Sequence, residues 1–193
     1  MSSPRCPFLA DADGTFTEAT ERFESLVAPL DDERANWSPD EKTWSVAACI
    51  DHLATTSEMY FVHLDPAIER GHERRLAGAQ PYGRGTWVGR LLLGTLDPER
   101  ARFKAVGAPR AFRPQQGTMD FATVCDRFRQ VQLRWHTLLR RADGLALGRI
   151  KLATPVSRFL KLTAAQAILV NAYHEPRHLA QAERLTRSPQ FPA

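Results

Sequence analysis

The chain has 193 residues, of which 43% are hydrophobic and 25% charged, and its formal net charge at pH 7 is +4. These values are typical of one globular domain, so we expect residues 1–193 to form a single domain, without low-complexity or collagenous segments. The three cysteines, Cys6, Cys49 and Cys125, are far apart and form no CxxC pair, which argues against a disulfide framework and a thiolate zinc site.

Targeting signals are not evident. The first residues lack the basic stretch and the run of about seven or more apolar residues that a secretory signal needs. The apolar run at residues 168–170 is interrupted by Asn171 and His174, far short of the roughly 20 apolar residues that span a bilayer. We therefore expect a cytoplasmic protein without a membrane partner.

Two helices are predicted in the first part of the chain. Over residues 11–28, Phe16, Ala19 and Phe23 recur at helical spacing, and a proline at position 29 ends the pattern. A second, strongly amphipathic helix follows over residues 46–69, with Thr43 or Ser45 as its cap. Its polar face carries Asp51, Thr55 and Glu58.

The rest of the chain begins with a long excursion, residues 71–117, where frequent glycine and proline leave room for only one or two short helices. A third helix is predicted over 120–143, closed by Gly144, and a fourth over 163–184, capped by Thr163. The fourth helix is apolar on nearly all sides, so we expect another chain or the excursion to cover the side opposite its histidines. Residues 145–162 are interpreted as irregular, and no convincing strand alternation appears. The sequence thus predicts an all-α fold with four long helices.

Two histidines four residues apart mark the fourth predicted helix. At 3.6 residues per turn, His174 and His178 stack on one face, and the rest of that face is apolar enough to meet a core. A buried polar group without a partner costs about 1–3 kcal/mol, so both imidazoles need a hydrogen bond or a metal ion. The pair indicates either hydrogen-bonded core histidines or two metal ligands.

The same segment reads literally as HExxH, the signature of zinc proteases in which the glutamate is a general base. We interpret this match as accidental, because the extended motif would need glycine and histidine where the chain has Gln181 and Arg184. Pro176, within the motif, is also expected to kink or loosen the helix. Glu175 lies about 90° from the histidine pair, so it is either a general base or a solvated or helix-packing carboxylate.

A third ligand is available on the second predicted helix. His52 lies on the apolar face of that helix, where one inward histidine can meet the inward pair of the fourth. Three neutral imidazoles leave one coordination position open, as in catalytic rather than structural zinc sites. Taken alone, His52 also fits a hydrogen-bonded core histidine.

These motifs resemble those of the DinB/YfiT-like superfamily. The resemblance spans most of the chain and rests on a Trp-Ser helix start at residues 44–45, on a histidine seven residues after that serine, and on a His-x3-His-x2-Gln motif near the carboxyl end. It implies a four-helix bundle with a three-histidine site for zinc, nickel or another divalent ion, often in a homodimer. The implied metal ligands are His52, His174 and His178. Gln181 is implied to contact one of these histidines without binding the metal itself.

The resemblance also implies a class of activity. Members with known activities are thiol S-transferases and isomerases that use low-molecular-weight thiols such as bacillithiol or mycothiol, and metal-dependent hydrolases. We therefore expect a small-molecule substrate and a divalent metal cofactor, with a low-molecular-weight thiol or water as the second reactant. The residues do not separate a transferase from a hydrolase, and a noncatalytic metal- or ligand-binding dimer is the remaining alternative.

Other polar residues are weaker candidates for the site. Cys49 lies one turn from His52 and either approaches the metal or is a core thiol. His63 lies about 16 Å further along the same helix, too far to share the site. The third predicted helix carries arginines without a nucleic-acid motif, so we expect a solvated face and no nucleic-acid partner: Arg127, Arg129, Arg134, Arg140 and Arg141. Arginines of the excursion could contact an anionic substrate: Arg74, Arg75, Arg84 and Arg90.

Overall fold

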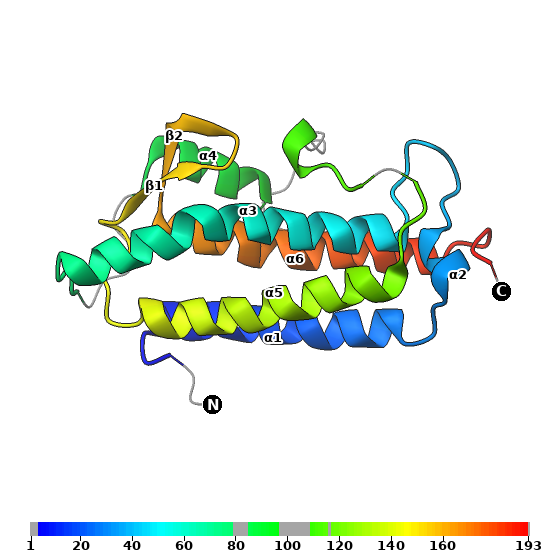
Figure 1. Cartoon of the computed structure of the whole chain (residues 1–193), viewed down its shortest axis with the longest axis horizontal. Coiled ribbons are helices and arrows are strands. Elements are labelled where there is room, and N and C mark those ends of the chain that lie inside the picture. The colour runs from blue at the N-terminus through cyan, green and yellow to red at the C-terminus, as the bar shows by residue number, and fades with distance from the viewer. Residues whose placement is uncertain (1–3, 79–84, 97–108, 116, 193) are drawn as a thin grey trace.

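Four long helices set the architecture. The computed structural model describes residues 4–78, 85–96, 109–115 and 117–192. The long helices are α1 (Pro7–Val27), α3 (Val46–Glu73), α5 (Phe121–Ala142) and α6 (Ala164–Thr186), and they lie side by side along most of their length (Figure 1). Both α3 and α1 pack against α5 and against α6. The chain is thus mostly helical, as predicted, and the two histidine-bearing helices, α3 and α6, are neighbours.

Aromatic side chains fill the interface between α1 and α5. Apolar residues recur every three or four positions in both helices, so they gather on one side of each. Phe16 stacks on Trp135 with ring centroids 4.7 Å apart, and Phe23 packs on Phe128 at 4.5 Å. All four rings are buried, and truncating such a residue costs about 3–5 kcal/mol. Helix α1 begins earlier than predicted, at Pro7, because proline fits the first turn of a helix.

Side-chain caps fix the starts of the histidine-bearing helices. Ser45 caps α3 by accepting a hydrogen bond from the Ala48 N–H at 3.1 Å. Thr163 caps α6 in a reciprocal capping box with Gln166. Both caps confirm the predicted helix starts. Gly144, which follows α5, has a φ of +82°, a left-handed conformation that favours glycine after a helix end.

A small sheet corrects the interpretation of residues 145–162 as irregular. The antiparallel strands β1 (Lys151–Thr154) and β2 (Ser157–Thr163) form a hairpin there. The alternation typical of strands is absent because β1 is short and residues 158–161 of β2 are all exposed. The hairpin begins close to α3 at Gly71, where a Cβ atom would lie 2.6 Å from the Ile150 Cδ1. Glycine therefore permits this close approach.

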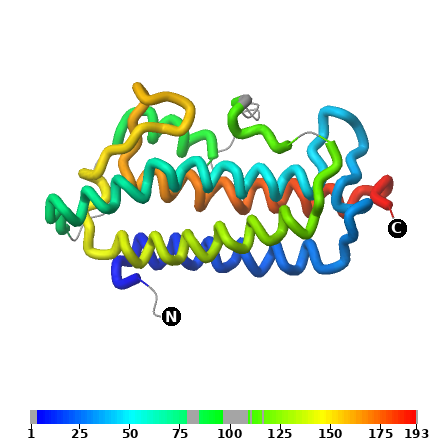
Figure 2. Tube along the Cα trace, viewed as in Figure 1, coloured from blue at the N-terminus to red at the C-terminus, as the bar shows by residue number. Residues whose placement is uncertain are grey.

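The excursion between α3 and α5 folds back onto α6. The described residues of the excursion hold α4 (Trp87–Leu96) and the short 3-10 helix η1 (Arg110–Phe112), in line with the prediction of one or two short helices. Helix α4 packs against α6 and β2 and lies beside the hairpin in Figure 2. Gln166 of α6 accepts a hydrogen bond from the Thr86 N–H at 2.9 Å, and Gly89 leaves room for its side chain. The back of α6 is thus covered by the excursion.

A short helix that the sequence did not predict, α2 (Asp32–Asn36), lies between α1 and α3 in the chain and packs against α5. Asp31 caps it by accepting from the Arg34 N–H. The Asn36 side chain donates to the Met119 carbonyl at 2.9 Å and accepts from the Met119 N–H at 2.8 Å. Across the described residues, no helix combines the length and apolarity needed to cross a bilayer.

Candidate metal centre

Three histidines converge between α3 and α6. His52 comes from α3, and His174 and His178 from successive turns of α6. One ring nitrogen from each lies within 4.8 Å of the others, and the Nε2 atoms of His52 and His174 are 3.1 Å apart. The ring centroids are separated by 4.5–4.8 Å. The fold therefore brings together the three side chains that the sequence suggested as ligands.

Hydrogen bonds on the outer ring nitrogens orient two of these imidazoles. The His52 Nδ1–H donates to the Phe112 carbonyl of η1, and the His178 Nδ1–H donates to Gln181 Oε1 at 3.0 Å. The proton positions follow from these partners, since a carbonyl or amide oxygen can only accept. With the proton on Nδ1, the lone pair of Nε2 faces the shared space between the rings. Such outer contacts typically fix the tautomer and direction of metal-ligating histidines.

Burial lowers the pKa of all three imidazoles. The pKa of His174 is well below its ordinary value because of burial, reinforced by the neighbouring His178 and His52 and by Arg177. Burial lowers the pKa of His178 to about 3, and it also lowers the pKa of His52. In the metal-free protein the rings are therefore neutral at neutral pH, and neutral imidazole is the form that binds a metal ion.

The indole ring of Trp44 covers one side of the histidine group. Its centroid lies 4.7 Å from that of His52 and 5.7 Å from that of His178. Trp44 immediately precedes the α3 cap Ser45, so the helix start that places His52 also places the indole. An aromatic wall of this kind excludes water from its side of a site. The sequence indicated Trp44 only as part of a helix start and missed its place at the site.

Glu175 points away from the histidines and into the core. Only 1% of the residue is exposed, and both carboxylate oxygens accept from Gln132 Nε2 of α5 at 3.0 Å. Burial raises the pKa of this carboxyl to about 8. The geometry favours the helix-packing interpretation of Glu175 over the general-base interpretation, although the carboxyl is buried rather than solvated.

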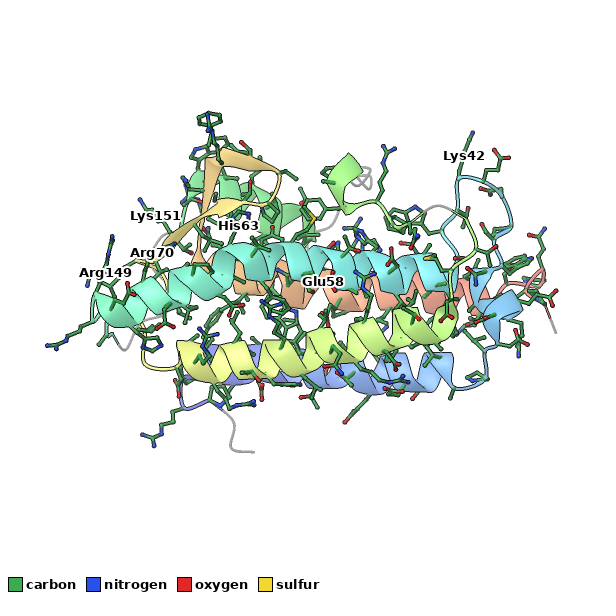
Figure 3. The ribbon with its side chains drawn as sticks, viewed as in Figure 1. Lys42, Glu58, His63, Arg70, Arg149 and Lys151 are labelled. Atoms are coloured by element: carbon green, nitrogen blue, oxygen red, sulfur yellow. The ribbon has the colours of Figure 1, made fainter. Side chains whose placement is uncertain are left out.

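Cys49 and His63 lie outside the histidine group. The group of ligand atoms found within the described residues contains neither of them. Cys49 is buried, and burial raises the pKa of its thiol to about 12, so it behaves as a core thiol. His63 lies eleven residues after His52 on α3, where Figure 3 labels it toward the hairpin end of the helix.

The arginines of α5 are largely paired with acidic side chains, so the predicted solvated face is only partly correct. Arg127 binds Asp51 and Glu58 of α3 at 2.5 and 2.7 Å. Arg129 binds Glu24 of α1 at 2.8 Å. Further along, two arginines share one aspartate of α3: Arg134 and Arg141 with Asp65. These ion pairs tie α5 to its neighbours and partly neutralise its positive charge.

Two of the four excursion arginines, Arg74 and Arg75, lie far from the histidine group. Arg74 and Arg75 follow the end of α3, at about 33 Å from His52 along the axis for a rise of about 1.5 Å per residue. Arg90 of α4 donates to the Gly85 carbonyl at 3.3 Å. Arg84 falls outside the described residues. The suggested contact with an anionic substrate therefore receives no support from Arg74 or Arg75.

The donor set suits a divalent ion of the zinc type. Two imidazole nitrogens bound to one tetrahedral zinc ion at about 2.0–2.1 Å stand about 3.3–3.4 Å apart. The separation of 3.1 Å between the Nε2 atoms of His52 and His174 is close to this value. The widest separation in the group is 4.8 Å, which a small rotation of one imidazole would reduce. The three histidines could therefore hold one metal ion.

Comparison with known proteins identifies a family. A family model described as the DinB superfamily matches residues 15–182. No curated protein and no solved structure gives a significant match. The matched span runs from α1 to α6 and includes the three histidines and Gln181. Because the match covers most of the sequence, this chain belongs to the DinB superfamily.

Proposed function

We propose that this protein is a metal-dependent enzyme in which His52, His174 and His178 hold one divalent ion, such as zinc or nickel. The observation that carries the proposal is the convergence of three imidazole nitrogens, with two of the rings oriented by hydrogen bonds on Nδ1. Three protein ligands leave one coordination position for a reactant, which distinguishes catalytic zinc sites from closed structural ones. The four long helices support classing the fold as a four-helix bundle.

The protein orients the histidine rings and excludes water from one side of the site. The Phe112 carbonyl and Gln181 hold the His52 and His178 rings, while Trp44 shields one side of the group from water. When bound, a divalent ion lowers the pKa of a thiol or water at its open position and orients it toward an electrophile. Glu175 is turned toward Gln132, so it is not positioned to take a proton from that reactant.

The reaction class that we favour is attack of a low-molecular-weight thiol on a small-molecule electrophile. In an S-transferase the sulfur stays on the electrophile and displaces a leaving group, such as chloride from chlorodinitrobenzene, and in an isomerase the thiol adds and is released again after the rearrangement. The support is membership of the DinB superfamily together with the open three-histidine arrangement. Hydrolysis uses the same ligands with water as the reactant. Turnover of chlorodinitrobenzene or a maleylpyruvate-like electrophile with a panel of thiols, compared with ester and amide hydrolysis without thiol, separates the two reactions.

A second candidate is a noncatalytic metal- or ligand-binding bundle. The observation that favours it is the contact of 3.1 Å between the Nε2 atoms of His52 and His174, which also fits a direct hydrogen bond between two imidazoles. In that case the histidines satisfy one another without a metal ion.

Metal content separates the two candidates. We expect protein purified without a histidine tag to contain about one equivalent of divalent metal, in line with a single three-ligand site. His178→Ala should abolish this content, and His63→Ala, which changes a half-buried histidine outside the group, should keep it. Metal-free wild-type protein that also fails to take up added zinc or nickel would overturn the proposal.

The remaining proposals concern assembly and location. We propose a homodimer in the cytoplasm, acting on a small molecule. Large apolar side chains exposed on α4 and β2 are compatible with a subunit contact: Trp87 is 67% exposed and Phe159 is 78% exposed. Sedimentation should give twice the chain mass, and Phe159→Asp should shift it to the monomer. A wild-type monomer would overturn the dimer.

A further inference from the structure

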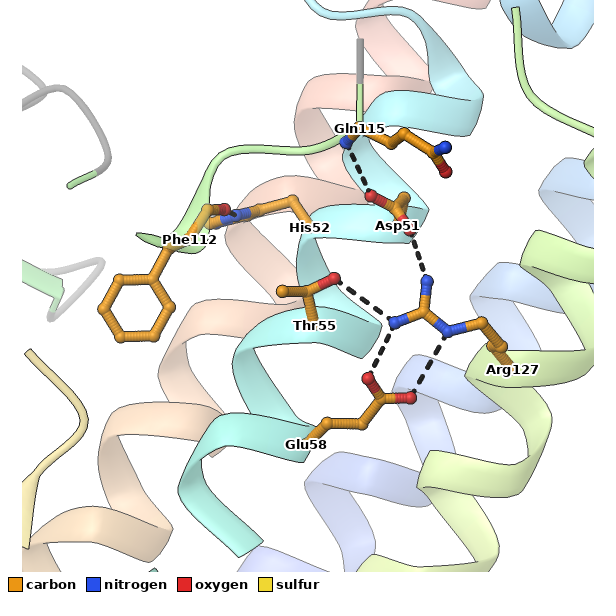
Figure 4. Close-up of polar contacts among 7 residues, drawn as sticks. All are labelled: Asp51, His52, Thr55, Glu58, Phe112, Gln115 and Arg127. Atoms are coloured by element: carbon orange, nitrogen blue, oxygen red, sulfur yellow. Dashed lines mark hydrogen bonds and ion pairs between the residues drawn. The ribbon is translucent and has the colours of Figure 1, made fainter. Parts of the chain in front are cut away.

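The residue before His52 is a buried carboxylate with a defined set of partners. Asp51 is only 3% exposed and accepts hydrogen bonds from Arg127 Nη1 at 2.5 Å and from the Gln115 backbone N–H at 2.9 Å (Figure 4). Arg127 also donates to Glu58 and Thr55, so its guanidinium is held on several sides. The carboxylate of Asp51 thus joins α3 to α5 and to the segment that follows η1.

Stability alone is a weak explanation for this arrangement. Asp51 is buried, whereas the Arg127 side chain is 36% exposed. Removing the Asp51 charge from water offsets much of its attraction to Arg127, so the pair gains little over well-packed apolar residues. Breaking such a pair is nevertheless costly, so the geometry around Asp51 is strongly determined. What the pair specifies here is the position of a backbone segment, because the second Asp51 oxygen is bound to the Gln115 N–H.

The same segment also contacts His52. The Phe112 carbonyl accepts from the His52 Nδ1–H, and Gln115, which binds Asp51, lies three residues further on. Asp51 and His52 are consecutive on α3, so one turn of helix fastens the segment at two points (Figure 4). If the Gln115 contact is lost, the Phe112 carbonyl is no longer fixed at His52. The imidazole is then free to change its tautomer and direction.

We propose that Asp51, held by Arg127, is a positioning residue of the histidine site. It acts through the Gln115 N–H to keep the Phe112 carbonyl on His52 Nδ1, and this leaves His52 Nε2 turned toward His174 and His178. The inference rests on the proposed function only where it says that His52 Nε2 binds a metal ion. The effect of Asp51 on the orientation of the His52 ring in the metal-free protein does not depend on that function.

Two variants test the connection from Asp51 through Gln115 and Phe112 to His52, and each is compared with a matched control. Asp51→Ala removes the acceptor, while Glu58→Gln alters the other acidic partner of Arg127 and leaves the Gln115 contact in place. Gln115→Pro removes the backbone N–H, and it also replaces the side chain and fixes φ at this position. Gln115→Ala replaces the same exposed side chain and retains the N–H. The readouts are the dissociation constants for Co²⁺ and Ni²⁺, the visible spectrum of the Co²⁺ protein, and the ¹⁵N shifts of the His52 ring in the metal-free protein.

We expect Asp51→Ala and Gln115→Pro to weaken metal binding about 10–100-fold and to change the Co²⁺ spectrum, as loss of an outer partner typically does. In the metal-free protein both should reduce the population of the Nδ1–H tautomer of His52. Both controls should match wild type. If Asp51→Ala does not fold, the Gln115 pair decides the question.

The contrary outcomes are equally distinct. Wild-type affinity and tautomer in a folded Asp51→Ala or Gln115→Pro protein would overturn the inference, as would an equal loss in Glu58→Gln. If wild type binds no metal, the proposed function fails, and the His52 tautomer alone then decides whether Asp51 positions that ring.

Discussion

The indole of Trp44 lies nearly parallel to the imidazole of His178, with ring centroids 5.7 Å apart and planes inclined by 26°. An open-shell ion bound at the histidines would sit close enough to this indole to quench its fluorescence.

We predict that Ni²⁺ titration quenches the tryptophan emission of the metal-free protein in proportion to site occupancy. Trp44→Phe should lose most of this quenching and still bind one equivalent of Ni²⁺ by elemental analysis. The other tryptophans supply the residual emission, so Trp87→Phe is the matched control and should be quenched like wild type. Equal quenching in Trp44→Phe and wild type would place the ion elsewhere.

Gln181 should control the affinity for metal through His178. Its Oε1 accepts the His178 Nδ1–H at 3.0 Å, and removal of this acceptor lets the ring turn and changes its basicity. Gln181→Ala should therefore raise the dissociation constant for Zn²⁺ about 10–100-fold, measured by competition with a chromogenic chelator. Gln181→Glu keeps an acceptor at the same place, so it should bind within a few-fold of wild type. The idea fails if the alanine variant binds as tightly as the glutamate variant.

The long helices were predictable from the sequence because they follow from helical periodicity. Periodicity indicated each of the three histidines only as an inward-facing residue, and the resemblance to the DinB/YfiT-like superfamily implied that they form one site. His174 and His178 must share a face at a spacing of four, and His52 stands among apolar residues that can only face the core. The caps at Ser45 and Thr163 are equally local, since each bonds an N–H three residues ahead. Signals confined to one helix need no knowledge of the neighbouring helices.

The features that the sequence missed depend on contacts between distant segments. The group that orients His52 is the backbone carbonyl of Phe112, and a carbonyl carries no residue-specific signature. Asp51 and Arg127 were each assigned to polar faces, and only the packing of α3 on α5 shows that they bind each other. The hairpin was missed because its exposed residues do not alternate. These contacts have high sequence separation, so no local pattern predicts them.

A buried carboxylate in the core should make the protein less stable than it could be. Glu175 faces Gln132, whose own Oε1 is buried and has no hydrogen-bond partner within the described residues. Burial raises the pKa of Glu175 to about 8, so at neutral pH the folded protein holds this carboxyl mostly protonated, whereas the unfolded chain ionises it. Glu175→Gln removes this cost and supplies an N–H that Gln132 Oε1 can accept. We expect the free energy of unfolding of the metal-free protein at neutral pH to rise by about 1 kcal/mol, measured by urea denaturation.

The partner of Glu175 provides the control for this prediction. Gln132→Ala leaves the carboxyl without its donor, so it should lower the free energy of unfolding by about 1–3 kcal/mol. Destabilisation by Glu175→Gln would show that the carboxyl has a role in the core that an amide cannot supply.

Thiol reactivity should report the packing of α3 and α5. Burial raises the pKa of the Cys49 thiol to about 12 and that of Cys125 to about 11, whereas Cys6 is only half-buried before α1. At pH 8 the thiolate fractions of Cys49 and Cys125 are then about 1 in 10⁴ and 1 in 10³, and the thiolate is the reactive form. Native protein treated with iodoacetamide at pH 8 should therefore gain one label quickly, at Cys6, as resolved by peptide mass spectrometry. Unfolding in urea should expose all three cysteines to labelling. Rapid modification of Cys49 in the native protein would mean that the first turns of α3, and with them the position of His52, are open to solvent.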